Sequence, residues 1–193
     1  MRPYRKASRA EAEQRTRARI VDAAEELHGT LGPARTTVSA VAQHAGVTRA
    51  TVYRHFPDNE SLFLACSAQW QARQRGPDPA AWATYDDPLE RLRAGLTDIY
   101  RFYRGGEPML TLVHRDADAV PEHIREQRQQ TQEAWVHALL SGFPRRRGRT
   151  LRAALAHAAA YPTWRSLCVD HGLSDRSAVA LMVSMVGAVA RER

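Results

Sequence analysis

Apolar residues recur along this chain at intervals of three and four positions, the spacing of helices that bury one face. No segment alternates apolar and polar residues over a useful length, so the pattern predicts no strand. We therefore expect an all-α protein of about nine helices. Four precede residue 75: one from about Ser8 or Ala10 to His28, two short ones within 36–56, and one at about 59–73. The other five are expected at about 89–104, 108–118, 121–140, 150–171 and 175–190.

Glycine and proline residues interrupt this pattern at a few places. Gly76-Pro77-Asp78-Pro79 predicts the boundary between an amino-terminal domain, residues 1–75, and a carboxy-terminal domain, residues 76–193. Gly105-Gly106 is expected to end one helix before the next begins at Pro108. Pro162 is expected to bend the long helix at 150–171, because its ring removes one backbone hydrogen bond.

The segment TTVSAVAQHAGVTRATVYRHF, residues 36–56, predicts two short helices joined by a tight turn. The first has a stripe of small apolar residues that includes Val38, Val41 and Ala45. Gly46 follows where the chain needs a positive φ to leave the helix. Thr48 then supplies a hydroxyl suited to cap the next helix.

The second short helix, about Thr48 to Phe56, has an apolar face and a polar one. Val52 and Phe56 are expected to be buried. The residues expected to face solvent are Arg49, Thr51, Tyr53, Arg54 and His55. A short helix, a glycine turn and a polar second helix are the layout of a helix-turn-helix, whose second helix enters the major groove of DNA.

Residues from about Arg17 to Trp70 resemble the amino-terminal domain of the TetR family of bacterial transcription regulators. The matching positions are Gly32, Thr36-Thr37-Val38, Val41-Ala42, Ala45-Gly46-Val47-Thr48, Thr51 to Phe56 and Glu60-Ser61-Leu62. One position departs from the family pattern: Asn59 stands where the family usually has a lysine next to a DNA phosphate. The resemblance implies a three-helix DNA-binding domain followed by a helical bundle for ligand binding and dimerisation.

The residues expected to face DNA lie at the amino-terminal ends of the two short helices and along the second one. They are Thr37, Thr48, Arg49, Ala50, Thr51, Tyr53, Arg54 and His55. Hydroxyl and backbone N–H groups at helix starts can meet phosphate oxygens, which suits Thr37 and Thr48. Tyr53 and His55 resemble phosphate contacts of the family, whereas the forked Arg49 suits guanine O6 and N7.

The charge of the chain supports a polyanionic partner. The formal net charge is +7, and seven of the first 19 residues are basic. We interpret this leader as a contact to the DNA backbone or minor groove, with a solvated tail as the alternative. It lacks the apolar run of a secretory signal, and no segment approaches the roughly 20 apolar residues of a membrane span, so a cytoplasmic protein is expected. Cys66 and Cys168 are expected to be buried free thiols.

The last two helices carry more apolar residues than one inner face needs. Ala153, Leu155, Ala180, Val183 and Met185 are among them. This excess predicts a homodimer through the two helices, which the TetR resemblance also implies; ordinary core is the alternative. Two symmetry-related reading helices would read a palindromic operator.

Aromatic and methionine side chains between the two ends of the chain could line a cavity for an effector. The candidate residues are Tyr100, Tyr103, Met109, Leu112, His114, Trp135, Leu139, His157 and Tyr161. Because no cluster of inward cations accompanies them, a mostly apolar molecule is expected. Ordinary aromatic core is the alternative for each residue. A metal site at His114, Asp116, Asp118 and His123 has no recognisable ligand spacing, and the arginines at 145–147 are expected in a solvated loop.

Three classes of function remain to be compared. The leading hypothesis is a ligand-responsive transcription regulator, a repressor that binds DNA as a homodimer and is released by a small effector. The alternatives are a helical small-molecule carrier or enzyme, and an architectural DNA-binding protein without an effector. The sequence has no phosphate loop, nucleophile elbow or acid–base pair, so no catalytic residue and no cofactor are expected.

Overall fold

The computed structural model describes residues 2–143 and 148–191, and it describes side chains from residue 9 onward within these ranges. All regular elements in these ranges are helical, which confirms the expected all-α class. The chain divides into two compact units, and each is discontinuous in sequence. The first unit combines the chain up to Gln74 with Glu107–Arg125, and the second combines Arg75–Gly106 with the chain from Glu126.

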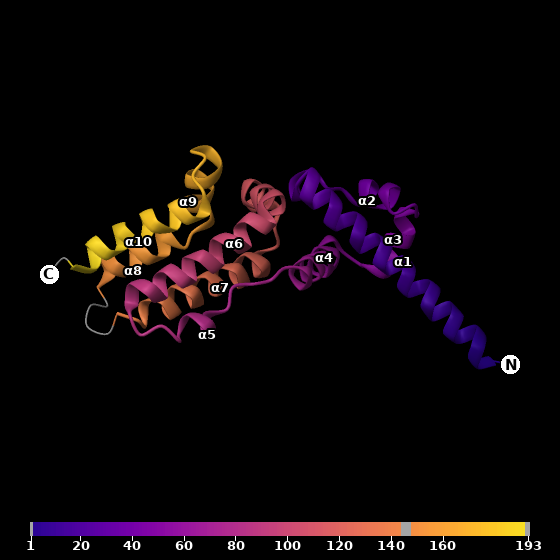
Figure 1. Ribbon diagram of the computed structural model, residues 1–193. Coiled ribbons are helices and arrows are strands. Elements are labelled where there is room, and N and C mark those ends of the chain that lie inside the picture. The colour runs from indigo at the N-terminus through magenta and orange to yellow at the C-terminus, as the bar shows by residue number, and fades with distance from the viewer. Residues whose placement is uncertain (1, 144–147, 192–193) are drawn as a thin grey trace. The chain divides into compact units, whose positions relative to one another are not determined.

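The first unit is built around one long helix. Figure 1 shows α1 crossing a group of shorter helices and extending beyond them at its amino-terminal end. The elements that lie wholly in this unit are α1 (Arg2–Thr30), η1 (Pro33–Arg35), α2 (Val38–His44), α3 (Arg49–His55), α4 (Asn59–Arg73) and η2 (Ala117–Ala119). The end of α6 (Pro88–Arg115) and the beginning of α7 (Glu122–Leu140) complete it.

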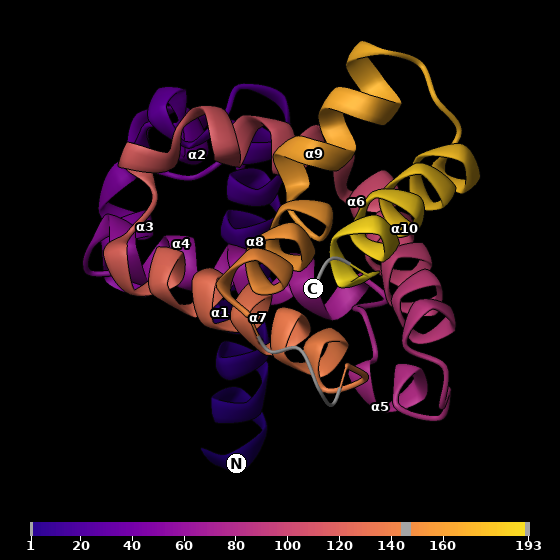
Figure 2. The same cartoon turned by 90° about the vertical axis from the view of Figure 1, so that its left-hand side faces the viewer.

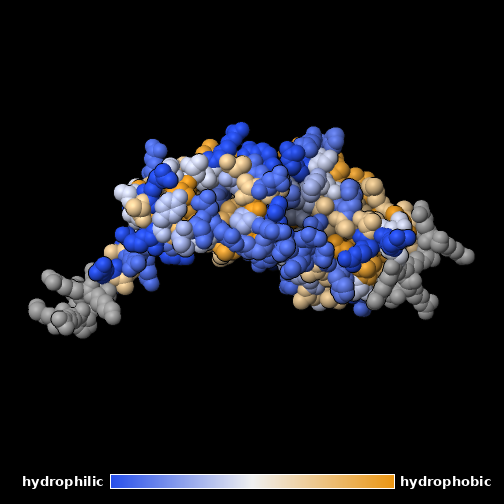
Figure 3. All heavy atoms as spheres, turned by 180° about the vertical axis from the view of Figure 1, so that it is seen from behind, coloured by the Kyte–Doolittle hydropathy of each residue, from blue (hydrophilic) through white to orange (hydrophobic). Residues whose placement is uncertain are grey.

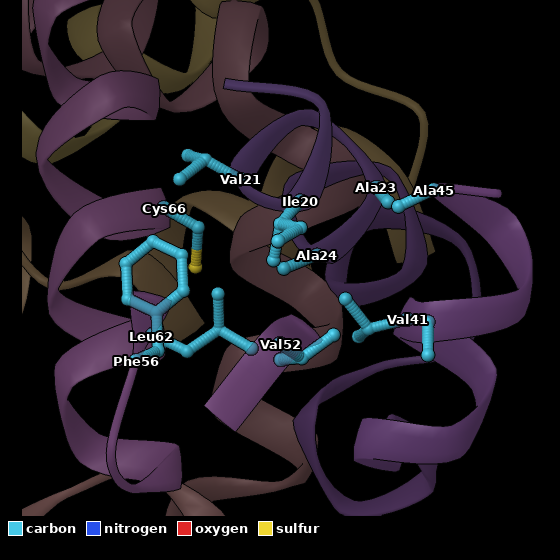
Figure 4. Packing of buried hydrophobic residues seen from close by; sticks show 11 residues of the cluster. Ile20, Val21, Ala23, Ala24, Val41, Ala45, Val52, Phe56, Leu62 and Cys66 are labelled. Carbon is cyan, nitrogen blue, oxygen red and sulfur yellow. The ribbon is translucent and has the colours of Figure 1, made fainter. Parts of the chain in front are cut away.

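The core of this unit holds the two seven-residue helices in place. Ile20 and Ala24 of α1 are fully buried, and Figure 4 shows them facing Val41 of α2 and Val52 of α3. Phe56 follows α3 directly and is buried in the same cluster. Because isolated helices this short are unstable in water, their packing on α1 is what makes them helical. Burying a side chain of the size of Ile20, Val52 or Phe56 contributes about 1.5–3 kcal/mol to the stability of the fold.

One polar pair is buried within the first unit. The Nδ1 atom of His28 lies 3.3 Å from Sγ of Cys66, and the His28 ring packs against Phe63 at 4.9 Å between centroids. Only 7% of His28 is exposed, and burial lowers its pKa to about 4. His28 is therefore a neutral part of the core at neutral pH.

The second unit is a bundle formed by the first part of α6, most of α7 and the carboxy-terminal helices. Its other elements are α5 (Pro79–Trp82), α8 (Arg149–Ala158), α9 (Tyr161–Arg165), the π-helical turn η3 (Ser166–Asp170) and α10 (Asp175–Arg191). Helices α8 and α10 lie side by side, as both ribbon views show (Figures 1 and 2). The short helix α5 was not expected from the sequence; its Trp82 is buried and donates to Asp98 Oδ2 at 3.1 Å.

A cluster of aromatic rings fills the centre of this bundle. Tyr103 packs against Tyr161 and Trp164 with ring centroids 5.2 and 5.9 Å away. The hydroxyl of Tyr100 donates to the carbonyl of Ala158 at 2.8 Å, and that of Tyr103 donates to Ala159 at 2.7 Å. Burial raises the pKa of both phenols, so they remain protonated donors.

These two phenols bond carbonyls at a point where one expected helix is broken. The prediction of a single bent helix at 150–171 is wrong: α8 ends at Ala158, and Pro162 lies in the first turn of the separate α9. A helix end leaves carbonyls without an intrahelical partner, and the phenols bond two of the carbonyls at this end. The interruption lies four residues before Pro162, because Pro162 has no N–H for the carbonyl of Ala158 and its ring clashes with that carbonyl.

The helix end expected at Gly105-Gly106 is also wrong, in the opposite sense. Here α6 continues from Pro88 to Arg115 through both glycines and through Pro108. Tyr103, Leu110 and Val113 are buried on either side of this segment, so tertiary packing outweighs the low helix propensity of glycine. The chain also passes from the second unit to the first here, between Gly106 and Glu107.

Lowering the pH should destabilise the protein through His28. The folded pKa of about 4 lies below the ordinary histidine pKa of 6.5 in the unfolded chain, so the unfolded state binds an extra proton between these values. Stability is then lost as the pH falls through this window, by about 2 kcal/mol from this group between pH ~7.5 and pH ~5. Urea unfolding of the wild-type protein and of His28→Leu at both pH values tests this. An equal pH dependence in the two proteins would contradict it.

Candidate nucleic-acid interface

The turn between α2 and α3 is held by two threonine caps and one glycine. The Thr37 hydroxyl oxygen accepts from the backbone N–H of Ala40 at 3.1 Å, and that of Thr48 accepts from Thr51 at 3.1 Å. Gly46 has a φ of +63°, which confirms the expected left-handed exit from α2. The caps fix where each helix begins, and thereby which side chains of α3 face outward.

The outer face of α3 carries most of the side chains expected to face DNA. The exposed members of the set are Thr37, Thr48, Arg49, Ala50, Tyr53 and Arg54. Thr51 is half-buried, and its hydroxyl lies 3.0 Å from that of Thr48. Arg49 and Arg54 are basic, and α3 has no acidic residue. This face therefore suits a polyanion.

His55 differs from the expectation that it faces solvent. Its side chain is half-buried, and its Nε2 atom is buried without a hydrogen-bond partner among the described residues. Phe56, one residue later, enters the core and draws the end of α3 inward. A contact from His55 to DNA would have to use another edge of the ring.

The beginning of α4 is acidic. Asp58 caps the helix by accepting from the N–H of Ser61 at 2.7 Å, and these hydrogen bonds lower the pKa of its carboxyl group. Glu60 lies 2.9 Å from Nδ1 of His123, and the exposed Asn59 stands between the two carboxylates. With no cation among these three residues, the surface is less suited to a phosphate than that of α3.

A polar clasp joins the end of α6 to the loop between α1 and α2. Asp116 accepts from the N–H of Ala34 at 3.0 Å, and Arg115 donates to the carbonyl of Leu31 at 2.7 Å. The two clasp residues also pair with each other at 2.7 Å, which lowers the pKa of Asp116. A Cβ at Gly32 would require the ends of both side chains to shift, and its φ of +92° is strained for any residue other than glycine.

An apolar cluster reinforces the clasp. Phe63 of α4 is buried together with Val113, Val120 and Ile124, and Met109 packs against the four. This association was not expected from the sequence, because the residues are ordinary helix positions separated by about 50 residues in the chain. The glycine at position 32 is the one local signal of a close approach.

A hollow of about 410 Å³ lies beside this cluster, within the first unit. It is lined by residues from the start of α2, the start of α4 and the segment from Asp118 to Arg125. None of the nine residues expected to line an effector cavity takes part in it. The structure therefore does not connect this hollow with the expected cavity.

The nine candidate cavity residues are divided between the two units. Tyr100, Tyr103, Trp135, Leu139, His157 and Tyr161 belong to the second unit, whereas Met109, Leu112 and His114 belong to the first. Tyr100, Tyr103, Leu139 and Tyr161 are buried in packed core, and His157 is exposed. Within the second unit, the structure packs the rings of Tyr100, Tyr103, Trp135 and Tyr161 against one another.

The alternative metal ligands are engaged elsewhere. His114 Nδ1 lies 2.9 Å from the carbonyl of Leu110, Asp116 belongs to the clasp, and His123 pairs with Glu60. Within the described residues, no group of three or more His, Cys, Asp or Glu could hold a metal ion. The arginines at 145–147 lie outside the described residues. In the part of the chain that the structure covers, no helix is both long and apolar enough to cross a membrane.

The geometry defines a helix-turn-helix, and comparison with known proteins shows which proteins this part of the chain is similar to. Residues 20–66 match the family described as bacterial regulatory proteins, tetR family. The segment is similar to the HTH-type transcriptional regulator TtgR of Pseudomonas putida, with 46% identity over 55 residues that cover 28% of this chain and 26% of TtgR. The HTH-type transcriptional repressor KstR of Rhodococcus jostii is 33% identical over 119 residues, 58% of this chain and 54% of KstR. The matches thus span from a quarter to about half of these relatives.

Solved structures agree over a longer stretch. A TetR-like transcriptional regulator from Rhodococcus sp. RHA1 has a TM-score of 0.66 with 20% identity, over 92% of this chain and 97% of that one. NalD of Pseudomonas aeruginosa has a TM-score of 0.59 with 22% identity, over 92% and 96% of the two chains. At these identities the likeness concerns the fold. The sequence matches concern the amino-terminal part of the chain, where residues 20–66 fit the tetR family model.

Replacing Gly32 by alanine should loosen the clasp. Gly32 has a φ of +92°, and its new Cβ would collide with the side chains of Arg115 and Asp116. We expect a loss of about 1–3 kcal/mol in the free energy of unfolding and faster hydrogen exchange around residues 31–34. Gly172→Ala is the matched control, because Gly172 also has a positive φ, +68°, but a Cβ there meets no atom within 4 Å. Equal stability of the two variants would contradict the assignment.

Proposed function

We propose that this protein is a transcription regulator, acting as a repressor, that binds a palindromic operator as a homodimer and is released by a small effector. The observation that supports DNA binding most directly is the exposed basic face of α3, fixed by the caps at Thr37 and Thr48 and by the turn at Gly46. TtgR and KstR are named as a regulator and a repressor, which favours the same function.

Sequence selectivity and general affinity for DNA would come from different residues of α3. Arg49 lies in the first turn and is exposed, so its guanidinium can bond two acceptors of one guanine in the major groove. Tyr53, one turn later, offers a hydroxyl to the phosphate backbone. Arg49 would therefore contribute selectivity, and Tyr53 would contribute affinity for any sequence.

Selection from a random-sequence duplex pool, followed by binding assays with the enriched duplex, tests the proposal. Arg49→Ala should weaken binding to this duplex by about 1–3 kcal/mol and relax selectivity at one position. Tyr53→Phe removes only a hydroxyl, so it should weaken all duplexes alike. If the selection enriches no sequence, the proposed regulator function is refuted. Unchanged affinity and selectivity in Arg49→Ala would refute the assigned reading role.

The proposed dimer rests on apolar side chains that α10 leaves exposed. Leu181 is 41% exposed and Met185 is 51% exposed, one helical turn apart on the same face. Ala153 on the neighbouring α8 is exposed too. Val183, expected from the sequence at the seam, is instead 5% exposed because it packs within the protomer. A two-fold arrangement would cover the exposed face with its own copy.

A charge on this face should separate the protomers. In the proposed dimer, Met185→Glu would bury a carboxylate without a partner, so we expect a monomer that has lost affinity for the palindrome. Tyr85→Glu is the control, because Tyr85 is an exposed aromatic residue outside α8 and α10. Sedimentation at micromolar concentration measures both. A wild-type monomer, or an unchanged dimer in Met185→Glu, would exclude this interface.

Release by an effector requires that the effector binds two states of the protein with different affinity. We call the segment from α1 to α4, which holds the helix-turn-helix, the reading head. The clasp and the cluster around Phe63 attach parts of α6 and α7 to it, so a change in these helices can reach α4. A coupling of about 1–3 kcal/mol would lower operator affinity roughly 5–150-fold. The aromatic content of the second unit favours a mostly apolar effector, for which a thermal-shift screen with organic compounds is the direct search.

A further inference from the structure

The amino-terminal part of α1 lies outside the core of the first unit. We call residues 9–19 the arm; buried side chains of α1 begin only at Ile20. Every side chain of the arm is exposed except the half-buried Thr16. Figure 1 shows the helix continuing past α3 here, and Figure 3 shows a mainly hydrophilic surface on it. The arm thus contributes little to the core that holds the reading head.

The arginines of the arm fall on two sides of the helix. Arg9, Glu13 and Arg17 precede Ile20 and Ala24 at intervals of four, four, three and four residues. This spacing keeps them on one face, so Arg9 and Arg17 extend the line of the buried stripe beyond the core. Arg15 and Arg19 lie on other faces of the same helix by the same count. We call Arg9 and Arg17 the inner arginines and the other two the outer arginines.

One of the inner arginines contacts the residue that follows α3. The guanidinium carbon of Arg17 lies 4.7 Å from the centroid of the Phe56 ring, and Phe56 directly follows α3. This cation–π contact places a positive charge beside the end of α3. Among the described side chains, no carboxylate lies within ion-pair distance of Arg9, Arg17 or Arg19, whereas Arg15 lies 3.9 Å from Glu11. Arg9 and Arg17 also lie on the helix face that leads to the contact with Phe56, so they are the arm's better candidates for an external anion next to α3.

We propose that the inner arginines contact the phosphate backbone of DNA next to the base pairs that α3 reads. The inference rests on the proposed function and adds a second contact element to it. Arg9 and Arg17 are about 12 Å apart along the helix axis, which matches roughly three to four base-pair steps. The acidic start of α4, with Asp58 and Glu60, does not offer such a contact, so the arm supplies charge that α4 lacks.

The experiment compares two double variants with the same change in net charge. Arg9→Gln/Arg17→Gln removes the inner arginines, and Arg15→Gln/Arg19→Gln removes the outer ones. The probe is the enriched duplex, with and without about six extra base pairs at each end, and affinity is measured against salt concentration. The inner variant should lower the salt slope by about 0.9 for each phosphate that is no longer neutralised, and the longer duplex should no longer improve its binding. The outer variant should keep both the slope and the improvement.

Conservative replacement separates charge from structure. Arg9→Lys/Arg17→Lys should retain most of the salt slope, and circular dichroism should show equal helix content in all variants. Equal losses in the inner and outer variants, or no loss in either, would overturn the proposal.

Binding to a random-sequence duplex distinguishes the arm proposal from the proposed regulator function. If no sequence is enriched but the inner variant alone lowers the salt slope on this duplex, the proposed arm contact stands and the proposed regulator function is refuted. If the protein binds no duplex, both proposals are refuted.

Discussion

The packing of α1 against two very short helices is the constraint on which the rest of the first unit depends. Helices α2 and α3 have seven residues each, too few to persist alone in water. Ile20 and Ala24 provide the apolar surface on which Val41 and Val52 can be buried. Because each short helix buries so few side chains, its direction is set by α1 and by its own cap. The exposed face of α3 is a consequence of that burial.

Much of the reading head could be predicted because its signals are local. The caps at Thr37 and Thr48, the positive φ at Gly46 and the burial of Val52 each follow from a residue and its nearest neighbours in sequence. The same local reasoning predicted that His55 faces solvent. The side chain is half-buried instead, because Phe56 enters the core and draws the end of α3 inward. The roles of the exposed residues on DNA stay predictions.

The errors lie where distant residues decide the outcome. Gly105-Gly106 reads locally as a helix end, yet α6 continues because residues on both sides are packed. The helix before Pro162 ends at Ala158, whose carbonyl Pro162 cannot bond, and Tyr100 and Tyr103 supply donors at this end from more than 50 residues away. Gly32 is the only local sign of the clasp of Arg115 and Asp116, and the inward position of Val183 has no local sequence signal. The expected effector cavity stays a prediction.

The discontinuity of the first unit limits how this domain can be exchanged. A fragment cut after residue 75 would retain the helix-turn-helix but lose Val113, Val120 and Ile124, leaving Phe63 without its cover. Such a fragment would expose an aromatic side chain and would be prone to associate through it. Grafting this head onto a foreign sensor would therefore require carrying residues 107–125 as well. Any exchange of this part of the chain meets the same demand, because the transplanted α4 needs a matching surface from the end of α6 and the start of α7.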